Sequence, residues 1–338
     1  APMQQYHLGF SGKTQHSFYN ISGGYFNQKG ILLGSDYNKL NAKISVGSEV
    51  TSWLDVGINA NIYNDNNQIV GSSGDGFGGN GGSAIRYAFF RTSAIPTYDE
   101  NGGYVYLPDF PSFFGDGYNP VGVLEYHLDN NRKINGLFGD INFQTHFTDR
   151  LFLTSTFGLD RSNSTQRRMN RTWGTSNRIN SINSLNVAVN SISNWSISNV
   201  LNYRFTINND HSFTALLGTE AIRNNTKYIN SSDRDFADQN DVLVKLGNGK
   251  GIKTNSEAID ENKLLSYFGR VNYSNQGKYF ASALIRTDGS SRFVEGNRWG
   301  LFYSGSLGWR IDKENFFRNN LISKMMLRLG YGSVGDQE

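Results

Sequence analysis

Apolar and polar residues alternate strictly along several stretches of the chain. In the segment 54–62, apolar Leu54, Val56, Ile58, Ala60 and Ile62 are separated by Asp55, Gly57, Asn59 and Asn61. A period of two predicts a β-strand with one apolar and one polar face. The same alternation, with boundaries uncertain by roughly two to four residues, predicts twelve strands, at 5–12, 16–26, 39–50, 54–65, 134–147, 151–161, 188–205, 211–223, 263–275, 279–288, 300–312 and 324–334. No segment has a strong helical period.

The connections between these strands alternate in length. Short turns are expected at 13–15, 51–53, 148–150, 208–210 and 276–278, with a modest one at 313–323. Long polar connections are expected at 27–38, 66–133, 162–187, 224–262 and 289–299. Short periplasmic turns and long extracellular loops are typical of outer-membrane barrels. The fold class predicted is therefore all-β, an antiparallel transmembrane β-barrel wall, since a soluble sandwich has no reason to place every long loop at one end.

Aromatic residues collect beside the short turns, as in an aromatic girdle at the membrane interface. Because strands favour aromatic residues anyway, this feature also has a simpler explanation. The residues concerned are Trp53, Phe147, Phe152, Phe205, Phe213, Tyr273, Tyr279 and Phe280.

Composition narrows the class further. The mean hydropathy is negative and no run approaches the roughly 18 apolar residues that a membrane helix needs. A net charge of +3 is too balanced to indicate a nucleic-acid partner. The absence of cysteine excludes disulfides, thiolate metal sites and cysteine nucleophiles.

The direction of the first and last strands indicates a fragment. The strand 5–12 runs toward a short turn and the strand 324–334 runs away from one, so both chain ends should lie on the side of the long loops. A complete single-chain barrel has its ends on the other side. We therefore expect residues 1–338 to be part of one barrel domain that is incomplete at both ends.

The last hundred residues carry a series of motifs in a specific order and spacing: LLSYFGRVNY (264–273), RTDGSSRF (286–293), NRWG (297–300), SLGWRI (306–311) and LRLGYG (327–332). In this series the chain resembles the SusC-like (RagA-like) TonB-dependent transporters of Bacteroidota. The segments 19–30 and 94–104 are similar to an early barrel strand and a long outer loop of that family.

The resemblance implies about twelve strands of a barrel of roughly 22 strands, whose plug domain is not in this chain. It implies import of an oligomeric nutrient across the bacterial outer membrane, driven by the TonB complex through the missing N-terminal part, with a SusD-like surface lipoprotein as lid. A glycan is the expected nutrient. A peptide, siderophore or cobalamin remains the alternative. The barrel would contact lipid and lipopolysaccharide, and no catalytic role or nucleic-acid partner is expected.

Ligand contacts in such a transporter come from the outer loops and the lumen wall. The candidate substrate-binding residues are aromatic or cationic and lie in the two longest loops: Tyr98, Tyr104, Tyr106, Phe110, Tyr118, Tyr126, Arg171 and Trp173. Any of them could instead pack the loops together or against the lid. A second set is expected to face the lumen or plug, because arginine facing lipid at mid-membrane would cost about 2 to 4 kcal/mol: Arg270, Asp288, Arg292, Arg310 and Arg328.

Motifs for binding a dinucleotide or a metal ion have weaker support in the sequence. The glycines of 76–81 match a dinucleotide pattern, but without a flanking strand and helix they indicate a flexible loop. The five histidines lack metal-ligand spacing. Asp233 and Asp235 begin like a calcium loop, yet Ala237 stands at the third ligand position, so no cofactor beyond a possible loop-bound calcium is expected.

Two alternatives of other classes remain. An outer-membrane hydrolase could use His146 as base, although no motif ties a serine to it. A soluble β binding module would bury its apolar face against a second sheet.

Overall fold

The computed structural model describes residues 1–68, 88–89, 91–105, 119–125, 130–175, 178–240, 242–317 and 322–336. Twelve strands form one antiparallel sheet in which each strand pairs with the next along the chain. They are β1 (Met3–Lys13), β2 (Ser17–Gln28), β3 (Tyr37–Thr51), β4 (Leu54–Gln68), β5 (Asn131–His146), β6 (Leu151–Asn170), β9 (Ser184–Ile207), β10 (His211–Arg234), β11 (Thr254–Asn275), β12 (Tyr279–Ser290), β13 (Trp299–Arg310) and β14 (Met326–Gly332). The prediction of twelve antiparallel strands is confirmed.

Three strands are much longer than the sequence predicted. The expected loops 162–187 and 224–262 are wrong in extent, because β6 continues through Asn170, β10 through Arg234, and β11 already begins at Thr254. These extensions carry polar residues on both faces, so they lack the alternation that marks a strand beside hydrocarbon. Their backbones still pair in unbroken register, for example Ile229 with Val189 and Glu257.

Short elements lie in the connections at both ends of the sheet. β7 (Trp173–Thr175) and β8 (Arg178–Asn180) form a short hairpin, and α3 (Pro120–Glu125) is a single helical turn and a half that the sequence did not predict. A 3-10 turn, η1 (Ile311–Lys313), lies in the connection between β13 and β14. In the described part of the chain, no helix has the length and apolar character needed to cross a membrane.

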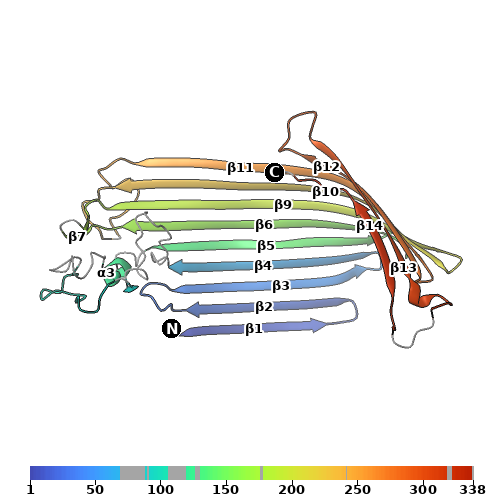
Figure 1. The fold of residues 1–338 in the computed structure, drawn as a ribbon, viewed down its shortest axis with the longest axis horizontal. Coiled ribbons are helices and arrows are strands. Elements are labelled where there is room, and N and C mark those ends of the chain that lie inside the picture. The colour runs from blue at the N-terminus through green and yellow to red at the C-terminus, as the bar shows by residue number, and fades with distance from the viewer. Residues whose placement is uncertain are drawn as a thin grey trace.

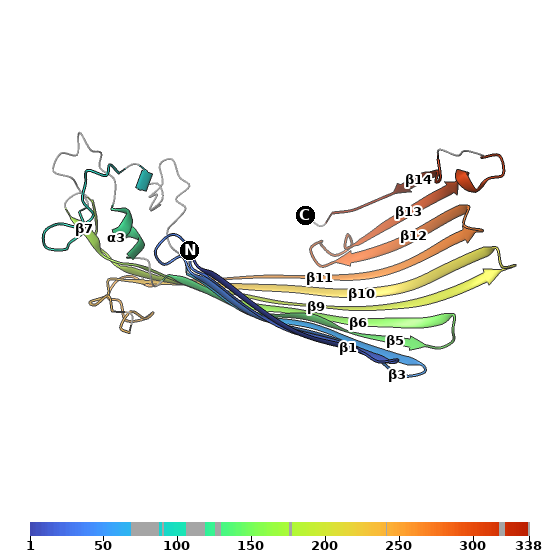
Figure 2. The ribbon, with the colours of Figure 1, turned by 90° about the horizontal axis from the view of Figure 1, so that it is seen from below.

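The connections of two to four residues lie at one end of the sheet. The longer connections lie at the other end, except for 311–325 between β13 and β14, which lies at the short-turn end. In Figures 1 and 2, α3 and β7 lie at the loop end, opposite the turns that join β1 to β2 and β3 to β4. Figure 2 also shows that the sheet is not flat but curves along its width. The predicted alternation of connection lengths is confirmed from β1 to β13. The last connection, predicted as a modest one at 313–323, spans 311–325 and is longer than the one between β12 and β13.

The two faces of the sheet differ in chemistry across all twelve strands. Paired residues share a face, and Ile58 stands between Val46 of β3 and Ile141 of β5 in a row that continues to Phe157. We call this the apolar face, and the opposite one, which carries Asn59 and Asp140, the polar face. No described strand or helix packs across the apolar face, and its large side chains are exposed, with Leu217 at 68% and Leu307 at 62%.

The polar face is more crowded than the apolar one. Ser266 on this face is fully buried although no second layer covers the sheet, and Phe152 is nearly so. Side chains converge on the inside of a curved sheet and diverge on the outside. The polar face therefore lines the concave side.

Aromatic residues line the apolar face near the short turns. Phe205 stacks on Phe213 with ring centroids 4.8 Å apart, and Phe213 contacts Tyr273 at 4.9 Å. Phe152 and Phe280, which the sequence assigned to the same girdle, alternate with these residues and lie on the polar face. The apolar face therefore carries an aromatic row near the short turns, but this row contains fewer residues than the predicted girdle.

Arginine substitution on the two faces tests their surroundings. Ile58→Arg places a charge on the apolar face, at a cost of about 2 to 4 kcal/mol if that face meets hydrocarbon, and should block assembly into the membrane. Asn59→Arg places the same side chain beside Asp140 and should be tolerated. The measurement is the fraction of full-length protein that migrates as folded, heat-modifiable barrel. Equal losses in both variants would contradict the assignment of the faces.

Candidate functional site on the polar wall and outer loops

A charged network spans three strands of the polar face. Arg286 of β12 donates from Nη2 to Glu220 Oε2 of β10 at 2.9 Å and to Ser266 Oγ of β11 at 2.8 Å, and from Nε to Asp288 Oδ1 at 2.7 Å. One cation thus meets two carboxylates that are each about three-quarters buried. This geometry fixes the guanidinium on the wall and leaves the cluster with an excess of negative charge.

Sheet register explains why these residues meet. Glu220 pairs with Ser266 and Ser266 with Asp288, so the three form one cross-strand row. In the adjacent row Phe268 lies between Gly218 and Arg286, and the Arg286 guanidinium lies 5.3 Å from the centre of the Phe268 ring. A Cβ atom on Gly218 would stand 2.3 Å from that ring, so the glycine makes room for it.

A second polar ladder follows the other half of the wall. Ser45 donates to Asn59 at 2.7 Å, and the Asn59 amide donates to both oxygens of Asp140 at 3.3 Å. Asn142 donates to the same carboxylate at 3.1 Å. The concave face therefore presents hydrogen-bonding groups from β3 to β12, which suits a wetted surface or contact with another protein domain.

The residues predicted for the lumen wall do not all lie on it. Register places Arg270, Asp288, Arg310 and Arg328 on the polar face. Arg310 lies at its turn end and pairs with Asp312, whereas Arg292 lies outside the sheet, in the connection that follows β12. Sequence reasoning missed Glu220, Ser266 and Arg286, although Arg286 and Asp288, two apart on one strand, were a usable signal of a charged face.

The outer-loop candidates are only partly visible. Tyr98 and Tyr104 pair their backbones and place their rings 5.2 Å apart, with Tyr98 about half exposed. The Tyr104 hydroxyl donates to Glu125 of α3, and Arg171 donates to the Gln239 carbonyl. The side chain of Trp173, and Tyr106, Phe110, Tyr118 and Tyr126 as a whole, lie outside the described residues, as does the glycine-rich segment 76–81.

The connection 235–253 between β10 and β11 is folded into a fixed shape. Phe236 and Val244 pack with Met169 and Leu185 into a small buried cluster. Arg167 donates to the Val244 carbonyl at 2.7 Å, and Asn183 and Phe236 exchange two hydrogen bonds. This connection therefore packs over the outer ends of β6 and β9.

Asp233 is the polar anchor of that connection. Its carboxylate, 1% exposed, accepts hydrogen bonds from the backbone amides of Arg234 at 2.8 Å, Gly247 at 2.8 Å and Gly249 at 3.0 Å. Burial alone would raise the pKa of Asp233, but these hydrogen bonds and nearby Lys253 hold it below its ordinary value. Both oxygens thus face N–H donors, an arrangement that suits an anchor better than a calcium ligand.

Described residues show no metal cluster and no catalytic triad. Among them, no group of three or more His, Cys, Asp or Glu side chains could hold an ion. His146 is hydrogen-bonded to Asp55 at 2.9 Å and Gln144 at 3.2 Å, so its identified partners are an acid and an amide and include no serine. The hydrolase alternative gains nothing from this geometry.

A curved antiparallel meander with an exposed apolar face, a polar concave face and its shortest turns gathered at one end defines the wall of a transmembrane β-barrel. Comparison with known proteins gives the same class. No family model matches the chain. It is 27% identical over 340 residues to TonB-dependent receptor P39 of Formosa agariphila, covering 98% of this chain and 30% of that receptor. It is 25% identical over 364 residues to TonB-dependent receptor SusC of Bacteroides thetaiotaomicron, covering 98% and 33%.

Similar solved structures indicate the same class of protein. The RagAB peptide transporter matches with a TM-score of 0.80 at 25% identity, covering all of this chain and 37% of that one. The ferric citrate transporter FecA matches at 6% identity with a TM-score of 0.52, which shows the fold alone. The chain is similar to SusC-like and RagA-like TonB-dependent receptors, and the resemblance seen in the sequence is confirmed. This chain spans about a third of the length of the curated relatives, which are named TonB-dependent receptors.

Filling the space at Gly218 should loosen the charged network. Gly218→Val would drive a side chain into the Phe268 ring, and we expect a loss of about 1 to 3 kcal/mol from overpacking. Gly330→Val is the control, because a Cβ there meets nothing closer than 3.7 Å on the same face. The measurement is the temperature at which full-length barrel loses its heat-modifiable mobility. A fall as large in the control as in the test variant would remove the special role of Gly218.

Removing the Asp233 carboxylate should release the connection 235–253. Asp233→Ala removes the acceptor of three backbone amides, of which that of Gly249 is buried, and we expect protease cleavage within this connection while the barrel stays folded. Asp238→Ala is the control, because its carboxylate is exposed and accepts one backbone amide, that of Asn240, where Asp233 accepts three. Because the pKa is lowered, the anchoring is present above the ordinary aspartate range and is lost only as pH falls through the native value. Resistance of the Asp233→Ala variant to cleavage would disprove the anchor.

Proposed function

We propose that this chain forms part of the barrel wall of a TonB-dependent importer of the bacterial outer membrane that takes up an oligomeric nutrient. The observation that carries the proposal is the pairing of an exposed apolar face with a hydrogen-bonding concave face along the whole sheet. Similarity to SusC and to RagAB over nearly the entire chain supports it. Energy from the TonB complex and a SusD-like lipoprotein as lid are the partners this proposal implies.

In the proposed mechanism the outer loops bind the nutrient and the polar wall lines its path. The outer loops, positioned by long strands and by the anchored connection 235–253, contact the nutrient beneath the lid. The polar wall faces a plug domain or water and supplies hydrogen bonds along the path. Nothing in this division requires a catalytic group.

The nutrient we favour is a glycan. Tyr98 and Tyr104 form an aromatic pair in an outer connection, and Tyr98 keeps about half of its surface exposed. Aromatic rings offer flat apolar surface against which the C–H faces of sugars pack, while neighbouring polar groups bind hydroxyls. The second candidate is a peptide, because the RagAB structures are described as a peptide transporter and importer.

The test is uptake by cells that carry the full-length protein with its neighbouring lipoprotein. Labelled oligosaccharides and oligopeptides are offered separately, with and without functional TonB. We expect TonB-dependent oligosaccharide uptake, lowered roughly twofold to tenfold by Tyr98→Ala for loss of about 0.5 to 1.5 kcal/mol of ring contact. Tyr6→Ala, which removes an exposed tyrosine from the apolar face, is the control.

The uptake experiment separates the identity of the nutrient from the import function itself. Uptake of peptides alone would replace the glycan by a peptide and leave the importer intact. Uptake of both nutrients unchanged when TonB is inactivated would overturn the importer itself.

A further inference from the structure

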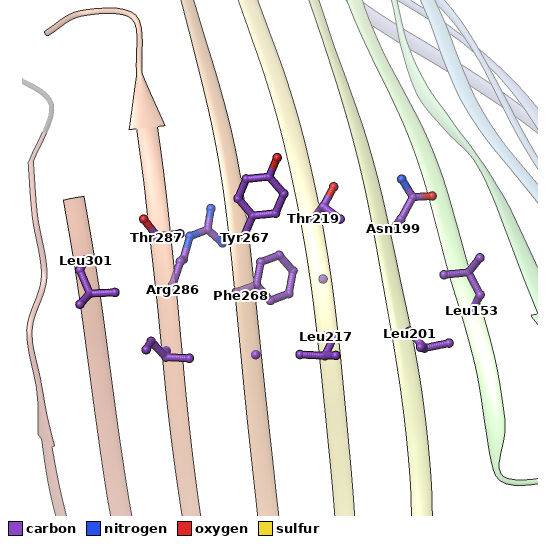
Figure 3. A pocket seen from close by; sticks show the side chains of 13 residues that line it. Leu153, Asn199, Leu201, Leu217, Thr219, Tyr267, Phe268, Arg286, Thr287 and Leu301 are labelled. Atoms are coloured by element: carbon purple, nitrogen blue, oxygen red, sulfur yellow. The ribbon is translucent and has the colours of Figure 1, made fainter. Parts of the chain in front are cut away.

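The apolar face is hollowed where β6, β9, β10, β11, β12 and β13 run side by side, and the floor of the hollow lies six residues from the short-turn ends of β9 to β12. The hollow has a volume of about 560 Å³ and an almost wholly apolar lining. Leu201, Leu217 and Ile285 form its floor row, and Asn199, Thr219, Tyr267 and Thr287 line the next row toward the loops. Figure 3 shows these residues on adjacent strands, with Leu153 and Leu301 at the two sides. We call this hollow the lipid groove.

A glycine creates the lipid groove. Gly269 lies between Leu217 and Ile285 in the floor row and between Tyr267 and Val271 on its own strand, and these four neighbours carry large side chains. A Cβ on Gly269 would lie 3.1 Å from Leu217 Cδ2, so any side chain there would occupy the groove. The groove is one of several hollows on this face, and another, of about 500 Å³, lies beside Gly305.

Basic side chains border the same face on its loop side. We call them the basic belt: Lys133, Arg161, Arg223, Lys227 and Lys263, all on the apolar-face register of β5, β6, β10 and β11. The exposed acids of this border among the described residues are Glu257 and Glu261. Arg223 pairs with Glu261 at 2.7 Å and Lys263 pairs with it at 2.8 Å, while Lys227 pairs with Glu257. The belt keeps an excess of positive charge.

The spacing between groove and belt matches one leaflet of a membrane. Arg223 is six residues along β10 from Leu217, and Lys263 is six along β11 from Gly269. Six residues at about 3.3 Å each span about 20 Å, or about 14 Å along the membrane normal at a tilt of about 45°. Half of a hydrocarbon core of about 30 Å is about 15 Å. Trp299, half exposed and stacked on Tyr267 at 6.0 Å, lies between the two levels as interfacial aromatics do.

We propose that the lipid groove and the basic belt form one site for an anionic, acylated lipid of the outer leaflet. An acyl chain lies in the groove over Gly269, and the phosphate lies against Arg223 and Lys263, in competition with Glu261. The site rests on the membrane position assigned under the proposed function. A second copy of this chain is a poorer occupant, because it would bring an equally basic belt against this one.

The first experiment separates a lipid site from a structural ion pair. Full-length protein is purified from outer membranes in mild detergent, offered lipopolysaccharide or zwitterionic phosphatidylethanolamine, and bound lipid is counted by native mass spectrometry. Arg223→Gln with Lys263→Gln should lower retention of the phosphorylated glycolipid roughly tenfold to thirtyfold, at about 1 kcal/mol per basic group near the surface. Glu261→Gln should raise it, since a competing carboxylate is gone. If all three substitutions lowered retention alike, the belt would be a structural ion pair and the proposal would fall.

The second experiment tests the groove. Gly269→Val fills it and should lower retention of both lipids, with faster acyl-chain exchange. Gly305→Val is the control for position, because it adds the same side chain to the same face in a second hollow, of about 500 Å³, and should leave retention unchanged. Lys43→Gln, on the polar face, controls for net charge. Unchanged retention in Gly269→Val would place the lipid elsewhere and overturn the site.

Failure of this site is distinguishable from failure of the proposed function. Lipid retention is measured on folded barrel without transport, and nutrient uptake is measured without reference to bound lipid. Loss of retention in the belt variant with normal uptake supports the lipid site alone.

Discussion

Strand pairing along the full sheet is the interaction on which the rest of this structure depends. In a hydrocarbon environment no water is available to satisfy backbone N–H and C=O groups, so each strand must pair with its neighbours throughout the membrane. The register achieves this from β1 to β14 in chain order, and it brings residues of like character side by side. One side-chain face can then be left uncovered, and exposed leucines such as Leu217 and Leu307 are the consequence.

The two ends of the sheet are secured by different chemistry. At the short-turn end, Glu314 accepts hydrogen bonds from Tyr279 at 2.5 Å, Trp309 at 3.0 Å and Lys278 at 3.3 Å, and these donors lower the pKa of its carboxyl. At the loop end, Asp233 is held by backbone amides and a small apolar cluster lies beside it. At the short-turn end the hydrogen bonds of Glu314 join side chains to one another. At the loop end the Asp233 carboxylate instead binds backbone amides of the connection 235–253. The hydrogen bonds of Asp233 therefore hold a long segment in place, which is what a ligand-facing loop requires.

The polar wall and the lipid groove lie on opposite sides of the same strands. Arg286 and Phe268 face the concave side, and their chain neighbours Ile285 and Tyr267 face the groove. Glycines serve both faces: Gly218 admits the Phe268 ring on one side, and Gly269 opens the groove on the other. A substitution on one face can therefore shift the strand positions that shape the other.

The sequence by itself determined the strands, their order and the faces, because alternation with a period of two is a local signal that survives without tertiary contacts. It did not determine the outer extensions of β6, β10 and β11, where Ser and Asn occupy both faces and only pairing with a neighbour defines the strand. The charged network of Glu220, Ser266 and Arg286, the anchoring by Asp233 and the groove at Gly269 were decided by the tertiary structure. Each joins residues from strands or loops that are distant in sequence, so it depends on register, which no single segment contains.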